Sequence, residues 1–163
     1  MGKTWSESGQ MTIRYAKPGD IEEVAELDMK LDGFEKKFDS SLKIGKKERT
    51  KKWLRKRLKD RNFKLIVTEK NSKIIGYTFG WIEKTESFTF KKRGYICDIF
   101  ILKEYRGKGI GSKLVKKLLK WFKSKGIRYV EVEVYSENKR SFKLWKYLGF
   151  REIMRRLRLK VVK

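Results

Sequence analysis

The sequence contains no histidine, one cysteine, Cys97, and one proline, Pro18. A single cysteine cannot form a disulfide within the chain, and without histidine neither a Cys/His zinc site nor an imidazole-dependent step is available. Any acid or base must therefore be Asp, Glu, Tyr, Lys or water, and we expect no bound metal. We expect Cys97 to be a core thiol rather than an acyl carrier, because no histidine is present to deprotonate it.

Acidic residues are also scarce, with 20 Asp and Glu against 44 Lys and Arg and a formal net charge of +24. A surface of this charge attracts anions and disfavours polyamine substrates. The basic residues are densest in KKERTKKWLRKRLKDR, residues 46–61. This segment is either a solubilising helix face or a surface that associates with an anionic partner such as nucleic acid or a ribosome. No motif for base-specific readout accompanies it.

Long apolar runs are absent as well. No run approaches the roughly 18 residues that a membrane helix needs, and no N-terminal segment has a signal-peptide pattern, so we expect a cytoplasmic protein without membrane contact. The hydrophobic fraction of 39% and the aromatic fraction of 13% argue against disorder. A length of 163 residues suits one domain. We expect a poorly ordered extension at residues 1–10 and a single domain at residues 11–163.

Hydrophobic periodicity and turn residues predict a mixed α/β (α+β) domain. Asp20 and Glu23 form a capping-box signature at the start of the first helix. Asn71 and Ser72 are turn residues between two strands and predict a hairpin. The expected strands are residues 11–17, 63–70, 74–84, 93–102, 128–136 and 157–161, and the expected helices are residues 21–31, 46–61, 110–125 and 138–148.

A cluster of glycines lies between the strand at residues 93–102 and the next helix. In YRGKGIGSKLVKKLLKWF, Tyr105 to Phe122, Gly107, Gly109 and Gly111 exceed what a simple turn requires. The N-terminus of a helix exposes unpaired main-chain N–H groups and the positive end of the macrodipole, which together bind phosphate. The spacing matches neither a P-loop nor a dinucleotide-binding fingerprint. A glycine-rich turn without a ligand would give the same local pattern.

The pattern Arg106-x-x-Gly109-x-Gly111, between a strand and a helix, resembles the pyrophosphate-binding motif of the GNAT superfamily of acetyl-CoA-dependent N-acetyltransferases. YSENKRSFKLWKYLGFRE, residues 135–152, is similar to the family's Asn-x-x-Ala-x-x-Leu-Tyr-x-x-x-Gly-Phe segment. Residues 12–160 follow the family's order of elements. The resemblance implies a mixed, mostly antiparallel central sheet with splayed middle strands and about four flanking helices.

The resemblance also implies how acetyl-CoA, the expected cosubstrate, is bound. The splayed strands of the family admit the pantetheine arm as a pseudo-strand, and the glycine loop binds the pyrophosphate. Trp145 stands where the family's segment has Tyr. The implied cofactor-binding residues are Ile99, Phe100 and Ile101 for the arm, Arg106, Gly107, Lys108, Gly109, Ile110, Gly111 and Ser112 for the pyrophosphate, Asn138 on the other side of the arm, and Trp145.

An amine attacks a thioester only when it is neutral. Deprotonation at pH 7 costs about 4.6 kcal/mol for a lysine ε-amine and about 1 to 1.4 kcal/mol for an α-amine. The family places the carboxylate base either on the strand before the glycine loop or on the strand after it. The matching positions on the first strand are Tyr95 and Cys97, with Asp98 on the opposite face if the strand alternates regularly. Glu133, which matches the base of ribosomal-protein N-terminal acetyltransferases, is the preferred base, and Asp98 is the alternative.

The general acid cannot be the usual one. Trp145 replaces the family's Tyr, and an indole does not donate a proton at a useful pKa. We expect Tyr135 to substitute for it. The loss is small, because expelling a thiolate at pH 7 costs only about 2 kcal/mol for a thiol pKa near 8.5.

The sequence therefore predicts an N-acetyltransferase that transfers acetyl from acetyl-CoA directly to a primary amine on a protein N-terminus, a lysine or a small molecule, and that acts as a monomer or homodimer. Two alternatives remain at this stage. One is a protein with the same fold that binds CoA but has little catalytic activity, because a carboxylate is missing at Tyr95 and Cys97. The other is a basic nucleic-acid-associated domain.

Overall fold

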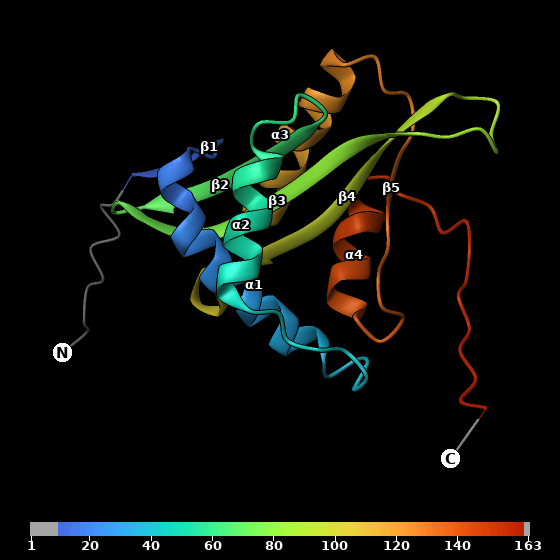
Figure 1. Cartoon of the computed structure of the whole chain (residues 1–163), viewed down its shortest axis with the longest axis horizontal. Helices are drawn as coiled ribbons and strands as arrows, with labels where there is room; N and C mark the ends of the chain where they lie inside the picture. Colours follow the sequence, from blue (N-terminus) through green and yellow to red (C-terminus); the bar gives the residue numbers. More distant parts are fainter. Residues whose placement is uncertain (1–9, 162–163) are drawn as a thin grey trace.

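The computed structural model describes residues 10–161 (Figure 1). Two short 3-10 turns, Pro18–Asp20 and Lys103–Tyr105, precede α1 and α3. The predicted extension at residues 1–10 lies outside the described residues, apart from Gln10. Among the residues described, no helix has the length and apolarity to cross a membrane. The elements in chain order are β1 (Met11–Tyr15), α1 (Ile21–Glu35), α2 (Lys47–Arg57), β2 (Phe63–Lys70), β3 (Lys73–Lys84), β4 (Lys92–Ile101), α3 (Ile110–Ser124), β5 (Val130–Val132) and α4 (Lys139–Tyr147).

The strands form one five-stranded sheet in the order β1-β2-β3-β4-β5. The pairs from β1 to β4 are antiparallel, whereas β5 runs parallel to β4. Asn71 and Ser72 connect β2 to β3 with φ values of 50° and 59°, the backbone that a tight two-residue hairpin requires. The predicted mixed, mostly antiparallel sheet and its central hairpin are confirmed.

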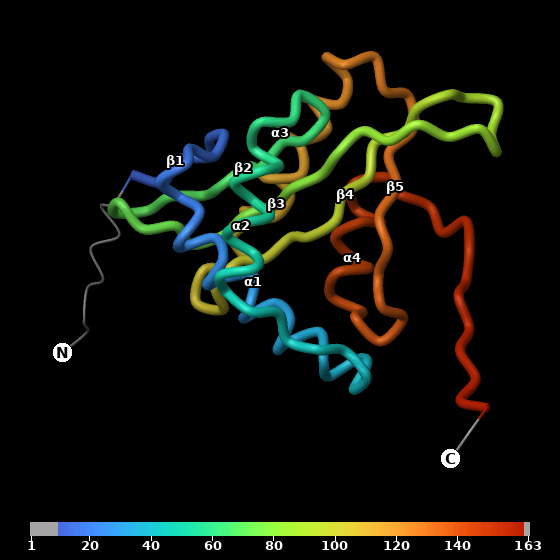
Figure 2. The backbone as a smooth tube through the Cα atoms, viewed as in Figure 1, coloured from blue at the N-terminus to red at the C-terminus, as the bar shows by residue number. Residues whose placement is uncertain are grey.

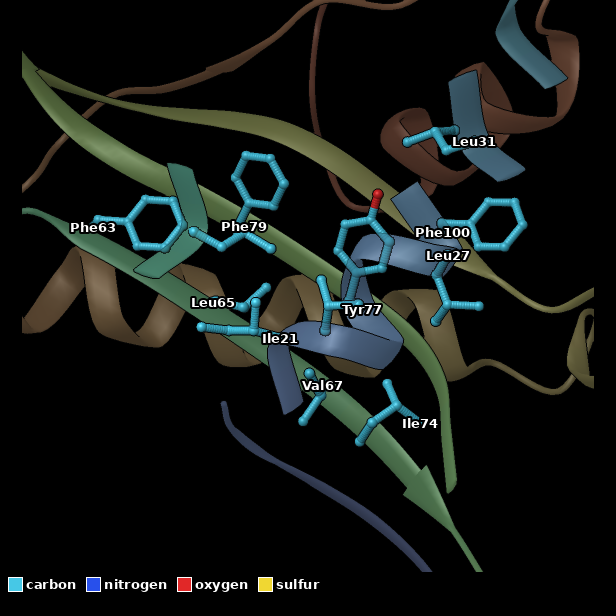
Figure 3. Close-up of a cluster of buried hydrophobic side chains, with 12 residues drawn as sticks. Ile21, Leu27, Leu31, Phe63, Leu65, Val67, Ile74, Tyr77, Phe79 and Phe100 are labelled. Carbon is cyan, nitrogen blue, oxygen red and sulfur yellow. The ribbon is translucent and has the colours of Figure 1, made fainter. Parts of the chain in front are cut away.

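Helices lie on both faces of the sheet, with α1 and α2 in front of it and α3 behind it in this view (Figures 1 and 2). On one face, α1 and α2 pack against a cluster that includes Leu27, Tyr77 and Phe79 (Figure 3). On the other face, α3 and α4 bury residues such as Leu118 and Trp145. α3 forms because its apolar residues recur at helical spacing and bury one stripe, with lysines on the remaining surface.

The middle strands separate after a short contact. β5 pairs with β4 only from Gly94 to Ile96, while β4 continues to Ile101. Residues 97–101 of β4 therefore have no β5 partner along that edge. The predicted splaying of the two strands is confirmed, and the gap between them opens toward the start of α3.

Two features near α1 differ from the sequence-based expectation. The helix continues through Gly33 to Glu35 instead of ending at residue 31. The capping-box prediction is wrong, because Asp20 accepts from the Lys17 amide at 2.6 Å and Glu23 accepts from the Ile74 amide at 2.9 Å. Asp20 also accepts from Arg14 of β1 at 2.7 Å, so both carboxylates connect the start of α1 to strands instead of capping it.

Two predicted strands also differ. The strand expected at residues 128–136 is reduced to Val130–Val132, the three residues that pair with β4 before the two strands separate. The strand expected at residues 157–161 is wrong, because this segment is extended but pairs with no strand within residues 10–161, and Leu157 is 92% exposed. Alternation alone cannot form a strand without an edge to pair with.

Gly94 provides a test of how closely α3 packs on the sheet. A Cβ added at Gly94 would lie 2.6 Å from Cε1 of Phe122, whose ring covers the strand. We expect Gly94→Ala to lower the free energy of unfolding by about 1 to 3 kcal/mol through overpacking. Gly33→Ala is the control, because nothing lies within 4 Å of its added Cβ, and it should raise stability by up to about 1 kcal/mol. Urea denaturation measures both; equal effects would contradict the packing argument.

Candidate active site

The glycine loop presents the start of α3 to open space. Gly109 has φ 73° and precedes the first helical residue, so the chain turns there into α3. The amides of Ile110, Gly111 and Ser112 belong to the first turn, which lacks intrahelical acceptors. No acidic residue lies in that turn. A Cβ added at Gly107 or Gly109 would meet nothing within 4 Å. This arrangement suits an anion that approaches the main chain closely.

Arg106 fixes the loop to the end of β4. Its Nε donates to the Ile101 carbonyl at 2.7 Å. Its guanidinium lies 5.2 Å from the ring centroid of Phe100 and 5.7 Å from that of Phe34. Burial lowers the pKa of Arg106, and the positive charge of Arg140 lowers it further. Arg106 is therefore held partly inside the fold, and its predicted contact with a pyrophosphate stays a prediction.

The gap between β4 and α4 is narrow at Gly111. A Cβ added there would meet Cδ1 of Ile101 and Cδ2 of Leu144 at 3.4 Å each, and Cδ1 of Ile99 at 3.5 Å. These are ordinary van der Waals distances, so β4, α3 and α4 meet around Gly111 with room for a methyl group. Phe100 lies on the opposite face, 7% exposed, against α1. The structure thus brings the expected arm-binding segment, Ile99 to Ile101, next to the glycine loop.

The other predicted cofactor residues lie at α4. Asn138 precedes this helix, and its Oδ1 accepts from the Ser141 amide at 3.1 Å. Trp145 is only 3% exposed and donates its Nε1–H to Ser141 Oγ at 3.0 Å. Lys108 is exposed on the glycine loop. The roles of these residues toward CoA stay predictions.

A bulge in β4 changes which face Asp98 occupies. Phe79 pairs with Asp98 and Gly80 pairs with Ile96, which leaves Cys97 as an additional residue on β4. Because directly paired residues share a face, Asp98 lies with Phe79 on the side of α1. The expectation that Asp98 points away from the face of Tyr95 is therefore wrong, since it assumed regular alternation.

Asp98 faces acidic residues of α1. Burial is the main cause that raises the pKa of Asp98 to about 7, and the charges of Asp28, Glu35 and Asp32 contribute to this rise. Burial also raises the pKa values of Asp28 and Glu35. Two of these acids have structural contacts: Tyr77 Oη donates to Asp28 at 2.8 Å, and the Gly45 amide donates to Asp32 at 2.7 Å.

We call Asp28, Asp32, Glu35 and Asp98 the acidic cluster. Its α1 members are not among the site residues expected from the sequence. Their spacing of four and then three residues places them on one helix face, and this signal was available. What the sequence could not show is that this face meets the bulged segment of β4.

Glu133 has a more solvated environment. Its side chain is 64% exposed, and its Oε1 lies 3.3 Å from Nη2 of Arg156. The Tyr135 ring stacks on Phe38 at 5.9 Å, and burial raises the pKa of Tyr135. Burial also raises the pKa of Tyr95, with a further contribution from the charge of Glu133. These residues therefore occupy the same side of the sheet as Asp98.

Cys97 is held as a thiol. Burial raises its pKa well above the usual range, and the charge of Asp98 raises it further. A group that stays protonated at neutral pH is a poor nucleophile. This environment fits the expected core thiol better than an acyl carrier.

The sequence and the fold were compared with those of known proteins. An uncharacterized N-acetyltransferase of Methanocaldococcus jannaschii is 34% identical over 145 residues, which cover 86% of this chain and 61% of that protein. A thialysine N-epsilon-acetyltransferase of Bos taurus is 36% identical over 81 residues, which cover 49% of this chain and 46% of that protein. The chain thus spans less than two thirds of the length of these relatives.

A solved structure of an aminoglycoside N-acetyltransferase in complex with CoA has the same fold, with a TM-score of 0.76 and 18% identity over 96% of this chain and 97% of that chain. A family model described as the acetyltransferase (GNAT) family matches residues 28–150, which is more than half of the sequence. The chain therefore belongs to the acetyltransferase (GNAT) family.

Proposed function

We propose that the chain is an N-acetyltransferase that transfers acetyl from acetyl-CoA directly to a primary amine. The observation that carries the proposal is the junction of three features: the open helix terminus at Gly109, the unpaired edge of β4 at residues 97–101, and a carboxylate of raised pKa, Asp98, on the adjoining face. The first suits a diphosphate, the second an extended arm, and the third a proton transfer.

In this reaction the amine nitrogen attacks the thioester carbonyl carbon, the C–S bond breaks, and the sulfur leaves as a thiolate that takes up a proton. The proton lost by the amine passes to the base. We propose Asp98 for this role in preference to Glu133. A base works best when its pKa is close to the working pH, and the pKa of Asp98 is about 7. Glu133 is instead exposed and paired with Arg156. Tyr135 remains the proposed proton donor.

The acidic cluster supports a cationic acceptor. Although the whole chain has a net charge of +24, charges separated by more than about 8 to 10 Å are largely screened by physiological salt. Partly buried carboxylates beside the site act at short range, where screening is weak. We therefore propose that the acceptor carries a second positive charge near the reacting amine, as diamines and lysine derivatives do. The net charge alone had led to the opposite expectation, that polyamine substrates are disfavoured.

Glu35 tests this acceptor class. It is the member of the acidic cluster best suited to neutralisation, because Asp28 and Asp32 hold structural hydrogen bonds. We expect Glu35→Gln to raise the KM for a diamine about tenfold, equivalent to about 1.4 kcal/mol, with little change for a monoamine or for acetyl-CoA. Glu48→Gln, at an exposed position of α2, is the matched control and should change neither KM.

The deciding experiment for the function itself is steady-state release of the CoA thiol with a panel of amines. Turnover with any primary amine supports the proposal. Saturable CoA binding without turnover would favour the alternative of a catalytically weak CoA-binding protein. Nucleic-acid binding with a steep salt dependence and no uptake of acetyl-CoA would favour the basic-domain alternative. The basic helix α2 gives this last alternative little support, because Lys47 and Lys51 already form ion pairs with Glu22 of α1.

A further inference from the structure

The hairpin between β3 and β4 projects past the helices in the view of Figures 1 and 2. The Thr85 amide donates to the Lys91 carbonyl at 3.0 Å, so the two strands are hydrogen-bonded up to this pair and residues 86–90 form the turn. Behind the turn, the Gly94 amide donates to the Tyr129 carbonyl at 2.9 Å. The hairpin is therefore joined to the residue that precedes β5.

Three aromatic rings form a continuous stack at this place: Phe88, Phe90 and Tyr129, here called the aromatic stack. The ring centroids of Phe88 and Phe90 lie 4.9 Å apart at an interplanar angle of 6°, and those of Phe90 and Tyr129 lie 4.4 Å apart at 29°. Phe88 is 48% exposed and Tyr129 is 50% exposed. Neither buried cluster among the described residues includes any of the three. Exposed rings gathered outside the core mark a binding surface.

The chain around the aromatic stack is basic. Residues 84–93 contain four basic residues and one acidic residue, and residues 123–129 contain three basic residues and no acidic one. Lys84 and Lys92 are exposed and directly paired across the hairpin. Like charges placed directly opposite one another destabilise a strand pair. A bound anion would relieve this repulsion.

The carboxylates beside the hairpin are paired with Arg93. Its Nη1 lies 2.6 Å from Oε2 of Glu131, and its Nε lies 3.5 Å from Oε1 of Glu83. The same guanidinium lies 5.9 Å from the ring centroid of Phe88. Because Arg93 neutralises these two acids, an anion that approaches the aromatic stack meets little repulsion from them.

We propose that the aromatic stack and the basic residues around it bind single-stranded nucleic acid. Unpaired bases stack on exposed aromatic rings, and lysine and arginine side chains attract the phosphates between them. Such binding tolerates any sequence, because every base has a π-face. This activity goes beyond the proposed acetyl transfer and does not rest on it.

The charges favour a nucleic acid over an apolar protein partner at this surface. An apolar partner would have to cover Lys84 and Lys92 without neutralising them, whereas phosphates complement them. The helix α2 is also basic, but its aromatic residue, Trp53, packs its ring against Phe63 and Phe79 with centroids 5.6 Å and 5.4 Å apart. The hairpin therefore combines charge with open ring surface better than α2 does.

The first test is fluorescence anisotropy of the full chain with a fluorescein-labelled 12-nucleotide oligo(U). We expect a dissociation constant of about 1 to 100 µM at 150 mM KCl, the range of sequence-independent binding. Oligo(dT) of the same length is the second probe, and the tighter of the two identifies the preferred sugar. A duplex of this length should bind at least about fivefold more weakly, because its bases are already stacked on one another.

Two outcomes of this measurement would overturn the proposal. One is that neither single strand binds. The other is that the duplex binds as tightly as the single strands or more tightly, because a surface that acts through charge alone follows the higher charge density of the duplex.

Variants of the rings separate stacking from charge. Phe88→Ala and Tyr129→Ala should each weaken oligo(U) binding about 5- to 100-fold, whereas Tyr129→Phe keeps the ring and should bind as the parent does. Tyr147→Ala is the matched control, because Tyr147 is 75% exposed with Lys116 Nζ 5.9 Å from its ring but lies on α4. If Tyr129→Ala and Phe88→Ala bind as tightly as the control, the aromatic stack binds no base.

Variants of the lysines locate the charge. Lys91→Gln combined with Lys92→Gln should reduce the slope of log affinity against log salt by about 0.7 for each lysine removed. Lys52→Gln combined with Lys56→Gln removes the same charge from exposed positions of α2 and should leave the slope unchanged. An equal reduction in both pairs would mean that the hairpin has no special part in binding, and the proposal would fail.

The remaining outcome concerns a second copy of the chain as the occupant. If oligo(U) does not bind and light scattering shows a multimer that Tyr129→Ala dissociates, the aromatic stack is a contact between copies and the proposal is overturned. Release of the CoA thiol should be the same in the parent and in all of these variants. Loss of nucleic-acid binding and failure of acetyl transfer can therefore be told apart.

Discussion

Replacing Asp98 by asparagine is expected to lower kcat/KM for the amine by about 100- to 10,000-fold, the usual contribution of a positioned base. The amide keeps the size of the side chain, so the bulge at Cys97 and the binding of acetyl-CoA should be preserved. The KM for acetyl-CoA should therefore change little. Thiol release measured against both substrates separates these effects.

The pH profile identifies the base more sharply than the rate alone. Because the pKa of Asp98 is about 7 and the base must be ionised, kcat/KM of the parent should rise as the pH increases through about 7. Asp98→Asn should remove this rise. Glu133→Gln is the control and should change kcat/KM by less than about threefold, since an exposed ion pair contributes little. The opposite result, with Glu133 essential and Asp98 dispensable, would transfer the role to Glu133.

Stability should move in the opposite direction to activity. Asp98 has a higher pKa in the folded state than the ordinary value of 3.8. Between these pKa values the folded state binds the extra proton, so stability falls as the pH rises toward 7 and stays lower above it. Asp98→Asn removes this penalty and should make the variant more stable than the parent at pH 8. Thermal unfolding at pH 5 and pH 8 measures the difference.

The parts of the fold that could be predicted are those with local causes. Asn71 and Ser72 adopt the left-handed backbone that the hairpin turn needs. The apolar stripe of α3 predicts a helix, and Gly109 precedes its first residue. The separation of β4 from β5 was predicted only from the family resemblance. The start of α3 was therefore predictable in outline, because main-chain amides at a helix start depend on the chain's local path more than on distant side chains.

The surroundings of the proposed base, Asp98, were less predictable because they depend on tertiary contacts. A bulge at Cys97 reverses the face of Asp98, and strict alternation contains no sign of a single additional residue. The raised pKa of Asp98 depends on α1, which is distant in sequence. Residues 157–161 show the same limit, because their alternation predicts a strand but no strand among residues 10–161 pairs with them.

The diphosphate site can be tested at Gly109 with a pair of variants that differ only in charge. Asp and Asn tolerate a left-handed backbone better than other side chains, and nothing lies within 4 Å of a Cβ at this position. Gly109→Asp should bind CoA about 30- to 100-fold more weakly than Gly109→Asn, because the carboxylate repels the diphosphate at short range. Calorimetry with coenzyme A measures both dissociation constants.

Gly126 provides the matched control at the other end of α3, with φ 71° and equally open space. Gly126→Asp and Gly126→Asn should bind CoA as the parent does, although Asp at a helix C-terminus lowers stability. An acetyl thioester that lacks the diphosphate should react equally with both Gly109 variants. Equal CoA affinity in Gly109→Asp and Gly109→Asn would instead mean that no diphosphate rests on this turn, and the proposed orientation of acetyl-CoA along β4 would have to be abandoned.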